Sequence, residues 1–377
     1  MSKNINPFVV SGKIPEEYFC DRVAEAAALE KALTNQLNVV LTSTRRMGKT
    51  SLVDFVFDKS TIADRYVTVF VDILSTTTFR EFVMAFGTAV FDRVASRSDK
   101  LRRLFATLLK SLSASFGYDP VQNTPTFDIR IGDIHQPEYT LSEIFEYLEK
   151  VESRCLVVID EFQQITRYPE KNVEALLRTH IQKLSNVNFV FSGSRRRLLE
   201  EIFFSSKRPF YQSAKALRLE AIDKEVYFAF AQKNFNNSGK YIDKEAFDKI
   251  YDTFWGVTFY VQRILKEAYA DVSVGETCDV ALTEKLIDDY VGENGTNIRE
   301  ELSHLTEVQK QVLYAVHKEH LAKNIASAAF NRKHSLRSPS STQTAVAKLL
   351  EYGFITRNEN VYSLSDPLLN LWLNCRR

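Results

Sequence analysis

Residues 43–52 read STRRMGKTSL, a stretch that matches the pattern G-x-x-x-x-G-K-[ST] except that Ser43 stands where the first glycine is expected. The apolar run LNVVL (37–41) before it predicts a buried strand, and the apolar residues of the following SLVDFVFDKS are spaced as in a core helix. Strand, polar loop and helix in this order form the context in which the pattern binds phosphate groups. We therefore predict a nucleotide-binding site here, against the alternative of a polar loop before an ordinary helix.

The chemistry of phosphate binding assigns a role to each part of this loop. Consecutive backbone N–H groups surround phosphate oxygens, and Gly48 lets the backbone approach them closely. Lys49 would reach the β- and γ-phosphates, and the hydroxyl of Thr50 would coordinate Mg²⁺. The loop residues predicted to contact the nucleotide are Ser43, Thr44, Arg45, Arg46, Met47, Gly48, Lys49, Thr50 and Ser51.

A second apolar run ends in two acids, as a magnesium-dependent nucleotide site requires. In CLVVIDEFQQI (155–165) the predicted strand ends at Asp160, which would hold the magnesium shell. Glu161 would polarise a water for attack on the γ-phosphate. Two acids that only solvate the end of a buried strand are the alternative, and the loop around Lys49 makes that alternative the weaker one.

Further runs predict a parallel sheet. RYVTVFVDI (65–73), NVNFVFSGS (186–194) and SAKALRLEAI (213–222) read as strands, and residues 141–153 and 172–185 have helical spacing. Strands alternating with helices predict an α/β fold with a doubly wound parallel sheet.

The strand that ends in FSGS would lie between the two phosphate motifs. Ser194 and Arg195 are therefore candidates to sense the γ-phosphate, and a plain strand exit before a basic helix is the alternative. The pair Asp160 and Glu161 favours an ATPase with an additional strand between its phosphate motifs. The Asn-Lys-x-Asp signature of GTPases is missing from the sequence, and a small-molecule kinase would be shorter.

The composition is that of a soluble globular protein. Of 377 residues, 45% are hydrophobic and 26% are charged, and the net charge of +1 excludes an overall polycation. Cys20, Cys155, Cys278 and Cys375 are scattered and form no C-x-x-C pair, which fits a reducing compartment without a zinc site. Because no apolar run is long enough to span a bilayer and the N-terminus has no signal-peptide core, we expect a cytoplasmic protein without a membrane partner.

The quoted motifs resemble the archaeal-type ATPase family, among the STAND-related P-loop ATPases of the AAA+ class. The resemblance rests on TRRMGKTSL, VVIDEFQ and FSGS, and it implies ATP and Mg²⁺ as ligands. Members carry an Arg and a Glu before a short helix, matched in YFCDRVAEAAALEKAL (18–33), which implies that Phe19, Arg22 and Glu25 lie near the adenine. A helix start with Asp21 as its N-cap is the alternative.

Two departures from the family pattern imply slow turnover. Many relatives carry Tyr-Gly-Arg before the fifth strand, where this chain has Tyr211, Gln212 and Ser213, so that Arg208 is the nearest substitute for the arginine. Relatives also carry Gly-x-Pro-x-Tyr in a helical lid. Here GVTFY (256–260) implies Gly256 and Tyr260 at the nucleotide, with Thr258 in place of the proline.

We predict three domains: a P-loop ATPase domain (1–222), a helical lid (223–303) and a winged helix (304–377). Residues 223–300 have helical periodicity with breaks at NNSGK and SVGETCD. From Thr306 the chain predicts a capped helix, a second helix with Ser338 as N-cap and Pro339 at its first position, and a hairpin in TRNENVYSL. The segment 306–377 carries ten Lys or Arg and five acids, whereas the rest of the chain is net negative.

This charge favours contact with double-stranded DNA, although many winged helices of such ATPases only pack against their own nucleotide domain. The candidate DNA contacts are Arg337, Ser340, Ser341, Gln343, Lys348 and Arg357. Three functions stay open: a slow magnesium-dependent ATPase acting as a nucleotide-controlled switch, an ATP-modulated DNA-binding regulator, and an ATP-binding scaffold with negligible turnover. A protein partner of the winged helix, the oligomeric state and the physiological signal also stay open.

Overall fold

The computed structural model describes residues 6–111, 115–119, 124–128 and 134–375. The chain forms two compact units, one of residues 11–222 and one that joins the N-terminal segment up to Val10 with the chain from Asp223 onward.

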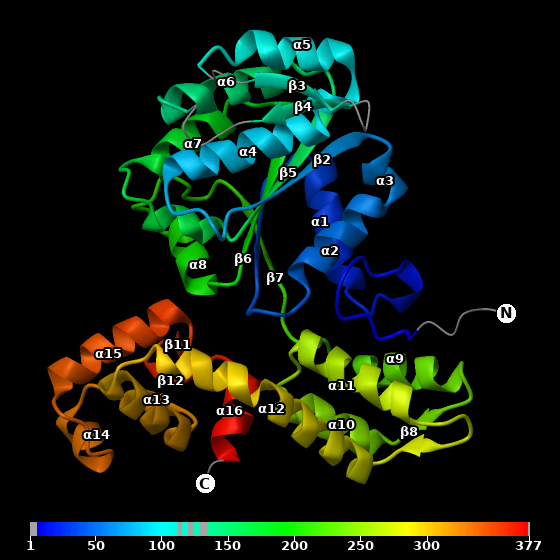
Figure 1. Cartoon of the computed structure of the whole chain (residues 1–377), viewed down its shortest axis with the longest axis vertical. Helices are drawn as coiled ribbons and strands as arrows, with labels where there is room; N and C mark the ends of the chain where they lie inside the picture. The colour runs from blue at the N-terminus through cyan, green and yellow to red at the C-terminus, as the bar shows by residue number, and fades with distance from the viewer. Residues whose placement is uncertain (1–5, 112–114, 120–123, 129–133, 376–377) are drawn as a thin grey trace. The chain divides into compact units, whose positions relative to one another are not determined.

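The first unit contains a five-stranded parallel sheet in the order β2-β5-β6-β1-β7. Its strands are β1 (Val39–Thr42), β2 (Tyr66–Asp72), β5 (Arg154–Asp160), β6 (Val187–Gly193) and β7 (Lys215–Arg218). Each strand overlaps a run that the sequence predicts as a strand, and the predicted α/β fold with a doubly wound sheet is confirmed (Figure 1).

Helices cover both faces of the sheet because its strands are apolar on both sides. On one face Leu41, Leu156 and Val190 pack with α1 (Val23–Thr34) and α2 (Lys49–Asp58). On the other face Val40 and Phe191 belong to a core shared with further helices. These helices are α4 (Phe79–Arg93), α5 (Asp99–Leu108), α6 (Pro137–Lys150), α7 (Val173–Ile181) and α8 (Arg196–Phe204), and Figure 1 shows α4, α6 and α7 opposite α1 and α2.

The segment between β2 and β5 holds more structure than the sequence analysis identified. Besides α4, α5 and α6 it contains the short helix η2 (Ala95–Arg97) and an antiparallel pair, β3 (Ser115–Asp119) with β4 (Thr124–Asp128). Two further short helices, η1 (Glu16–Tyr18) and α3 (Ser60–Ala63), precede β2. The short helix η4 (Phe162–Arg167) follows β5.

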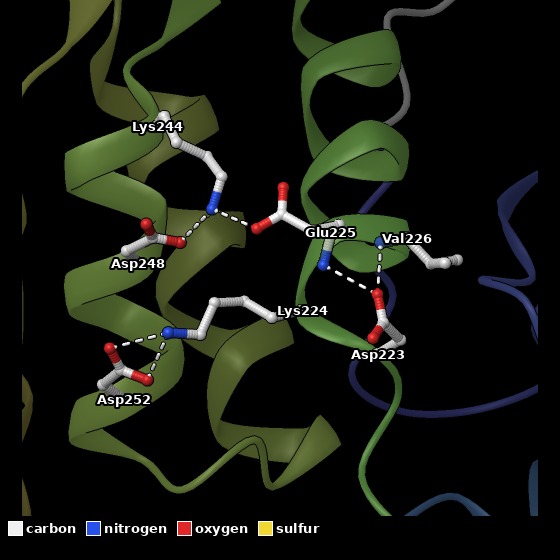
Figure 2. A network of polar contacts seen from close by, with 7 residues as sticks. All are labelled: Asp223, Lys224, Glu225, Val226, Lys244, Asp248 and Asp252. Atoms are coloured by element: carbon white, nitrogen blue, oxygen red, sulfur yellow. Dashed lines mark hydrogen bonds and ion pairs between the residues drawn. The ribbon is translucent and has the colours of Figure 1, made fainter.

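The second unit begins with a group of helices after β7. They are α9 (Lys224–Asn236), α10 (Lys244–Thr253), α11 (Thr258–Asp271) and the long α12 (Val280–Ser303), and the short strands β8 (Tyr241–Ile242) and β9 (Thr277–Cys278) pair in parallel. Figure 2 shows how charged side chains connect α9 and α10. Lys224 pairs with Asp252, and Lys244 lies between Asp248 and Glu225. Exposed pairs of this kind add little stability.

Two residues of the N-terminal segment, Asn6 and Phe8, contact these helices. The Phe8 ring is fully buried and contacts the rings of Phe230, Phe235 and Tyr269. The Asn6 side-chain amide donates to the carbonyl oxygen of Lys266 at 2.8 Å. The predicted nucleotide domain (1–222) therefore differs from the compact unit at its start, because a buried aromatic ring makes its contacts far along the chain.

The C-terminal part of this unit is the predicted winged helix. Its elements are α13 (Glu307–Glu319), β10 (Ala322–Lys323), α14 (Ala328–Lys333), α15 (Pro339–Tyr352), β11 (Ile355–Asn358), β12 (Val361–Leu364) and α16 (Pro367–Asn374). Thr306 and Gln309 form the expected capping box, and Ser338 caps α15. β10 adds a third strand to the predicted hairpin, in the order β10-β12-β11. Within the described part of the chain, none of the helices has the length and apolar character needed to cross a bilayer.

Candidate nucleotide-binding and catalytic site

The strand order brings the two phosphate motifs together. β6 lies between β1 and β5, so the chain segments that follow these three parallel strands meet at one edge of the sheet. Thr42 pairs with Gly193, and Phe191 pairs with Ile159 next to Asp160. The prediction that the FSGS strand separates the two motifs is therefore confirmed.

The backbone of the phosphate loop is left-handed at Gly48, directly before α2. Gly48 adopts a φ of 86° before the first turn of α2, a conformation that glycine takes without steric cost. Lys49 is buried, and its ammonium donates to the hydroxyl of Ser43 at 3.2 Å. Burial lowers the pKa of Lys49, while the carboxylates of Glu161 and Asp160 act in the opposite direction. A buried ammonium with one hydroxyl partner keeps donors for an anionic ligand.

Asp160 ends β5 with one carboxylate oxygen already engaged. Its Oδ1 accepts hydrogen bonds from the hydroxyl of Ser192 and from the backbone N–H of Glu161. Burial raises the pKa of Asp160, and the Ser192 hydrogen bond opposes that effect. Ser192 was not singled out in the sequence, although a serine in a strand whose residues are all buried is a signal that it has a polar partner.

Glu161 leaves the strand in a left-handed conformation with a φ of 55°. Its Oε2 accepts from the Ser194 hydroxyl at 3.0 Å and from the Ser194 backbone N–H at 3.4 Å. The same oxygen accepts from the side-chain amide of Gln163. The structure thus places Ser194 beside Glu161, and it adds Gln163, which the sequence analysis did not identify.

The donor set around Asp160 fits a magnesium ion that also takes ligands from a nucleotide. Oδ2 of Asp160 has no hydrogen bond to any described residue, and the side chain of Thr50 is exposed. Among the described residues, no group of three or more His, Cys, Asp or Glu could hold a metal by itself. A hydroxyl and one carboxylate are the protein ligands that Mg²⁺ takes when phosphates and waters complete its shell.

The segment before α1 contacts the phosphate loop and the helix that follows it. Arg22 is buried in a left-handed conformation, and its guanidinium donates to Glu25 at 2.8 Å and to the carbonyl oxygen of Met47 at 3.5 Å. Phe19 stacks on Phe55 of α2, with ring centroids 4.2 Å apart. Arg22 and not Asp21 is the N-cap residue of α1, and it makes no side-chain cap. Contact with adenine stays a prediction for both Phe19 and Arg22.

The other basic candidates differ in their surroundings. Arg45 and Arg46 are exposed on the loop, and Arg195 precedes α8. Arg208 forms an ion pair with Glu174 at 2.6 Å, so its guanidinium is engaged away from Glu161. Thr44, Met47 and Ser51 lie on the loop and the first turn of α2, and their contact with a nucleotide stays a prediction.

Gly256 and Tyr260 belong to the second unit. Gly256 has a φ of 66° before α11, and the Tyr260 ring is buried. The hydroxyl of Tyr260 donates to the Asp366 carboxylate, an interaction that the sequence did not indicate. A role of either residue at the adenine stays a prediction.

Four of the six candidate DNA contacts lie on α15. Its exposed residues Ser340, Gln343 and Lys348 recur at helical spacing, whereas Ser341 is half-buried. Arg337 is exposed just before the helix. Arg357 is half-buried in the hairpin, where its guanidinium donates to the side chain of Asn360 at 2.9 Å and lies over the Tyr362 ring.

A surface hollow of about 540 Å³ lies elsewhere in the first unit. It is lined by Arg65, Arg97 and Arg154, among others. Arg65 precedes β2 and Arg154 begins β5, so the hollow is at the end of the strands opposite to the phosphate loop. None of its residues takes part in the candidate site.

Several solved structures share the fold. The Walker-type ATPase PABY2304 of Pyrococcus abyssi has 16% identity and a TM-score of 0.64, over 98% of this chain and 99% of that chain. The Aeropyrum pernix ORC2 protein in ADPNP-ADP complexes has 14% identity and a TM-score of 0.60, over 98% and 96%. The Aeropyrum pernix ORC1 protein in complex with DNA has 11% identity and a TM-score of 0.51, over 99% and 98%.

Sequence profiles identify the family of the chain. No curated protein sequence matches the chain. Residues 297–375 match a profile described as a "probable winged helix domain". Residues 19–264 match the profile of an ATPase domain predominantly from Archaea, a span that is more than half of the chain and contains both phosphate motifs. The chain therefore belongs to this family of ATPase domains found predominantly in Archaea.

Proposed function

We propose that the protein is a slow, magnesium-dependent ATPase that acts as a nucleotide-controlled switch. The observation that carries the proposal is the meeting of Lys49, Asp160 and Glu161 at one edge of the sheet. Lys49 would bind the β- and γ-phosphates of ATP, and Thr50 and Asp160 would hold Mg²⁺, which neutralises phosphate charge when bound. Glu161 would accept a proton from the attacking water.

Slow turnover is proposed because the arginine of the family's Tyr-Gly-Arg triplet is missing from its position in this chain. Gln212 and Ser213 occupy those positions, and the nearby Arg208 is paired with Glu174. A cation at the transferring phosphate can contribute orders of magnitude in rate, so we expect slow hydrolysis without that arginine.

The test compares ATP binding and single-turnover phosphate release in three proteins. Lys49→Ala should abolish ATP binding measured by titration calorimetry, because no other loop cation is buried beside the two carboxylates. Glu161→Gln should keep ATP affinity and lower the hydrolysis rate by ~10²-fold or more, the scale of general-base catalysis. Lys150→Ala, which removes an exposed pair on α6, is the matched control. Near-native ATP affinity in Lys49→Ala would refute the site, and binding without any turnover in the wild type would leave an ATP-binding scaffold.

A second candidate is an ATP-modulated regulator that binds double-stranded DNA. It is favoured by the exposed polar side of α15 and by the excess of basic residues after Thr306. The Aeropyrum pernix ORC1 protein, which shares the fold, was solved in complex with DNA. Duplex binding that weakens steeply with salt supports this candidate, whereas its absence leaves a protein partner for the winged helix.

A further inference from the structure

We propose that Gln163 is a positioning residue for ATP hydrolysis, whose amide N–H holds the carboxylate of Glu161 in place for the reaction. The inference rests on the proposed ATPase function and assigns a role to a side chain outside the predicted site. Gln163 lies in η4, two residues after Glu161 and directly after the fully buried Phe162.

The hydrogen bonds around Glu161 converge on one oxygen. The Gln163 amide nitrogen and both the hydroxyl and the backbone N–H of Ser194 donate to Oε2. The amide of Gln163 must present its nitrogen here, because an ionised carboxylate only accepts hydrogen bonds. Oε1 of Glu161 has no hydrogen bond to any residue in the described ranges. That oxygen is left to accept a proton.

This arrangement accounts for the proton in the proposed reaction. The water oxygen bonds to the γ-phosphorus while its proton passes to Oε1 of Glu161, and the bond from the γ-phosphorus to the bridging oxygen breaks with its electrons leaving on ADP. A general base is effective only if it is held within reach of the water, since small misplacements cost large factors in rate. Gln163 and Ser194 hold Glu161 from the side that does not take the proton.

The burial of Gln163 indicates that its N–H is used. The side chain is 4% exposed, and its Oε1 has no hydrogen-bond partner among the described residues. Burying an unpaired amide oxygen costs free energy that an apolar side chain of the same size would not incur. Packing alone would therefore favour an apolar side chain over this amide. The side-chain hydrogen bond that Gln163 makes to a described residue goes to Glu161.

The neighbouring strand leaves room for this amide. A Cβ at Gly193 would lie 2.0 Å from Oε1 of Gln163 and 2.9 Å from Cδ1 of Leu199. Both distances are shorter than real Cβ contacts, so any other residue at 193 would displace the amide. The residue before Gln163 is held by the core, because the Phe162 ring packs on Phe191 with centroids 4.6 Å apart.

The experiment removes the N–H and leaves the shape. Gln163→Leu should lower kcat about 10- to 100-fold, as expected when a general base loses its orientation, and should leave KM for ATP unchanged. Gln164→Leu is the matched control, because Gln164 is the next residue and donates instead to the backbone carbonyl of Thr76 at 2.9 Å. The double variant Gln163→Leu with Glu161→Gln should be no slower than Glu161→Gln alone, since Gln163 acts through Glu161.

A readout without turnover completes the test. The side-chain carboxyl ¹³C resonance of Glu161, assigned by its loss in Glu161→Gln, should shift in Gln163→Leu and stay in place in Gln164→Leu. An unshifted resonance, an unchanged or increased kcat, or additive losses in the double variant would each overturn the role of Gln163. A wild type that binds ATP without releasing phosphate would instead refute the ATPase proposal, and the resonance would still report whether Gln163 holds Glu161.

Discussion

The hydroxyl of Tyr260 donates to the carboxylate of Asp366, with its oxygen 2.8 Å from Oδ1 and 2.9 Å from Oδ2. Tyr260 lies in the first turn of α11, and Asp366 is the N-cap of α16, where it also accepts from the backbone N–H of Leu368. One carboxylate therefore caps the last helix of the winged helix and binds a residue of α11 that is 106 positions away. The residue expected at the adenine joins the two parts of the second unit.

Tyr260→Phe should destabilise the second unit by about 1.5–3 kcal/mol, the usual contribution of a hydrogen bond to a charged group. The ring packing is kept, so the loss reports the hydroxyl. Urea unfolding gives the free energy, and hydrogen exchange should show faster opening of α16. Tyr241→Phe is the control, because Tyr241 is exposed in β8 of the same unit. Equal stability of the two variants would show that the Asp366 contact contributes nothing.

Thr258→Pro should stabilise the protein by about 0.4–1 kcal/mol. Thr258 is the first residue of α11, a position that proline favours, and Val257 before it has an extended backbone that tolerates a following proline. The substitution also removes a buried hydroxyl oxygen that has no partner among the described residues. Thermal unfolding measures the gain. Thr258→Ala is the control, because it removes the hydroxyl without restricting the backbone. A larger gain in stability in Thr258→Pro than in Thr258→Ala identifies the effect of the proline ring. A loss of stability in Thr258→Pro would mean that the backbone does not accept proline.

Glu30→Gln should cost about 0.5–1 kcal/mol at neutral pH and nothing in acid. Glu30 of α1 accepts from Lys59 at 2.8 Å and from Thr61 at 2.6 Å, and these hydrogen bonds lower its pKa. A carboxyl whose pKa is lower in the folded state adds stability above its unfolded pKa, and this stability is lost as the pH falls through the folded pKa. Unfolding curves of wild type and variant should therefore converge in acid. Glu17→Gln, at an exposed position, is the control and should cost less stability than Glu30→Gln at neutral pH.

Neutralising Arg337 and Lys348 should weaken duplex DNA binding if the winged helix contacts phosphates there. The number of counterions released on binding, measured as the slope of log K against log salt concentration, should fall by about two. Lys348 pairs with Glu351 at 2.8 Å in the free protein, so DNA must replace that contact. ATP and DNA should alter each other's affinity by the same factor, and we expect a coupling on the order of 1–2 kcal/mol. Titrations of each ligand with and without the other, at one salt concentration, test this. Affinity no tighter than the ~10⁻⁴–10⁻⁶ M of non-specific binding would refute the regulator.

Sequence alone located the phosphate loop and the acid pair because their function depends on local order. Gly48, Lys49 and Thr50 lie at a single strand-to-helix turn, and the short apolar runs before this turn and before Asp160 are typical of buried strands. The strands, the capping box at Thr306 and the Ser338 cap were predictable for the same reason, since each depends on neighbours within a few residues.

Tertiary structure decided which polar groups meet across the fold. Ser192 reaches Asp160 only because β6 is inserted between β1 and β5, and the bond from Ser194 to Glu161 depends on the same strand order. Gln163 reaches back to Glu161 because the chain turns left-handed at that residue, and Gly193 leaves space for the amide. Such contacts depend on packing between segments distant in the chain, which the local pattern of residues does not encode.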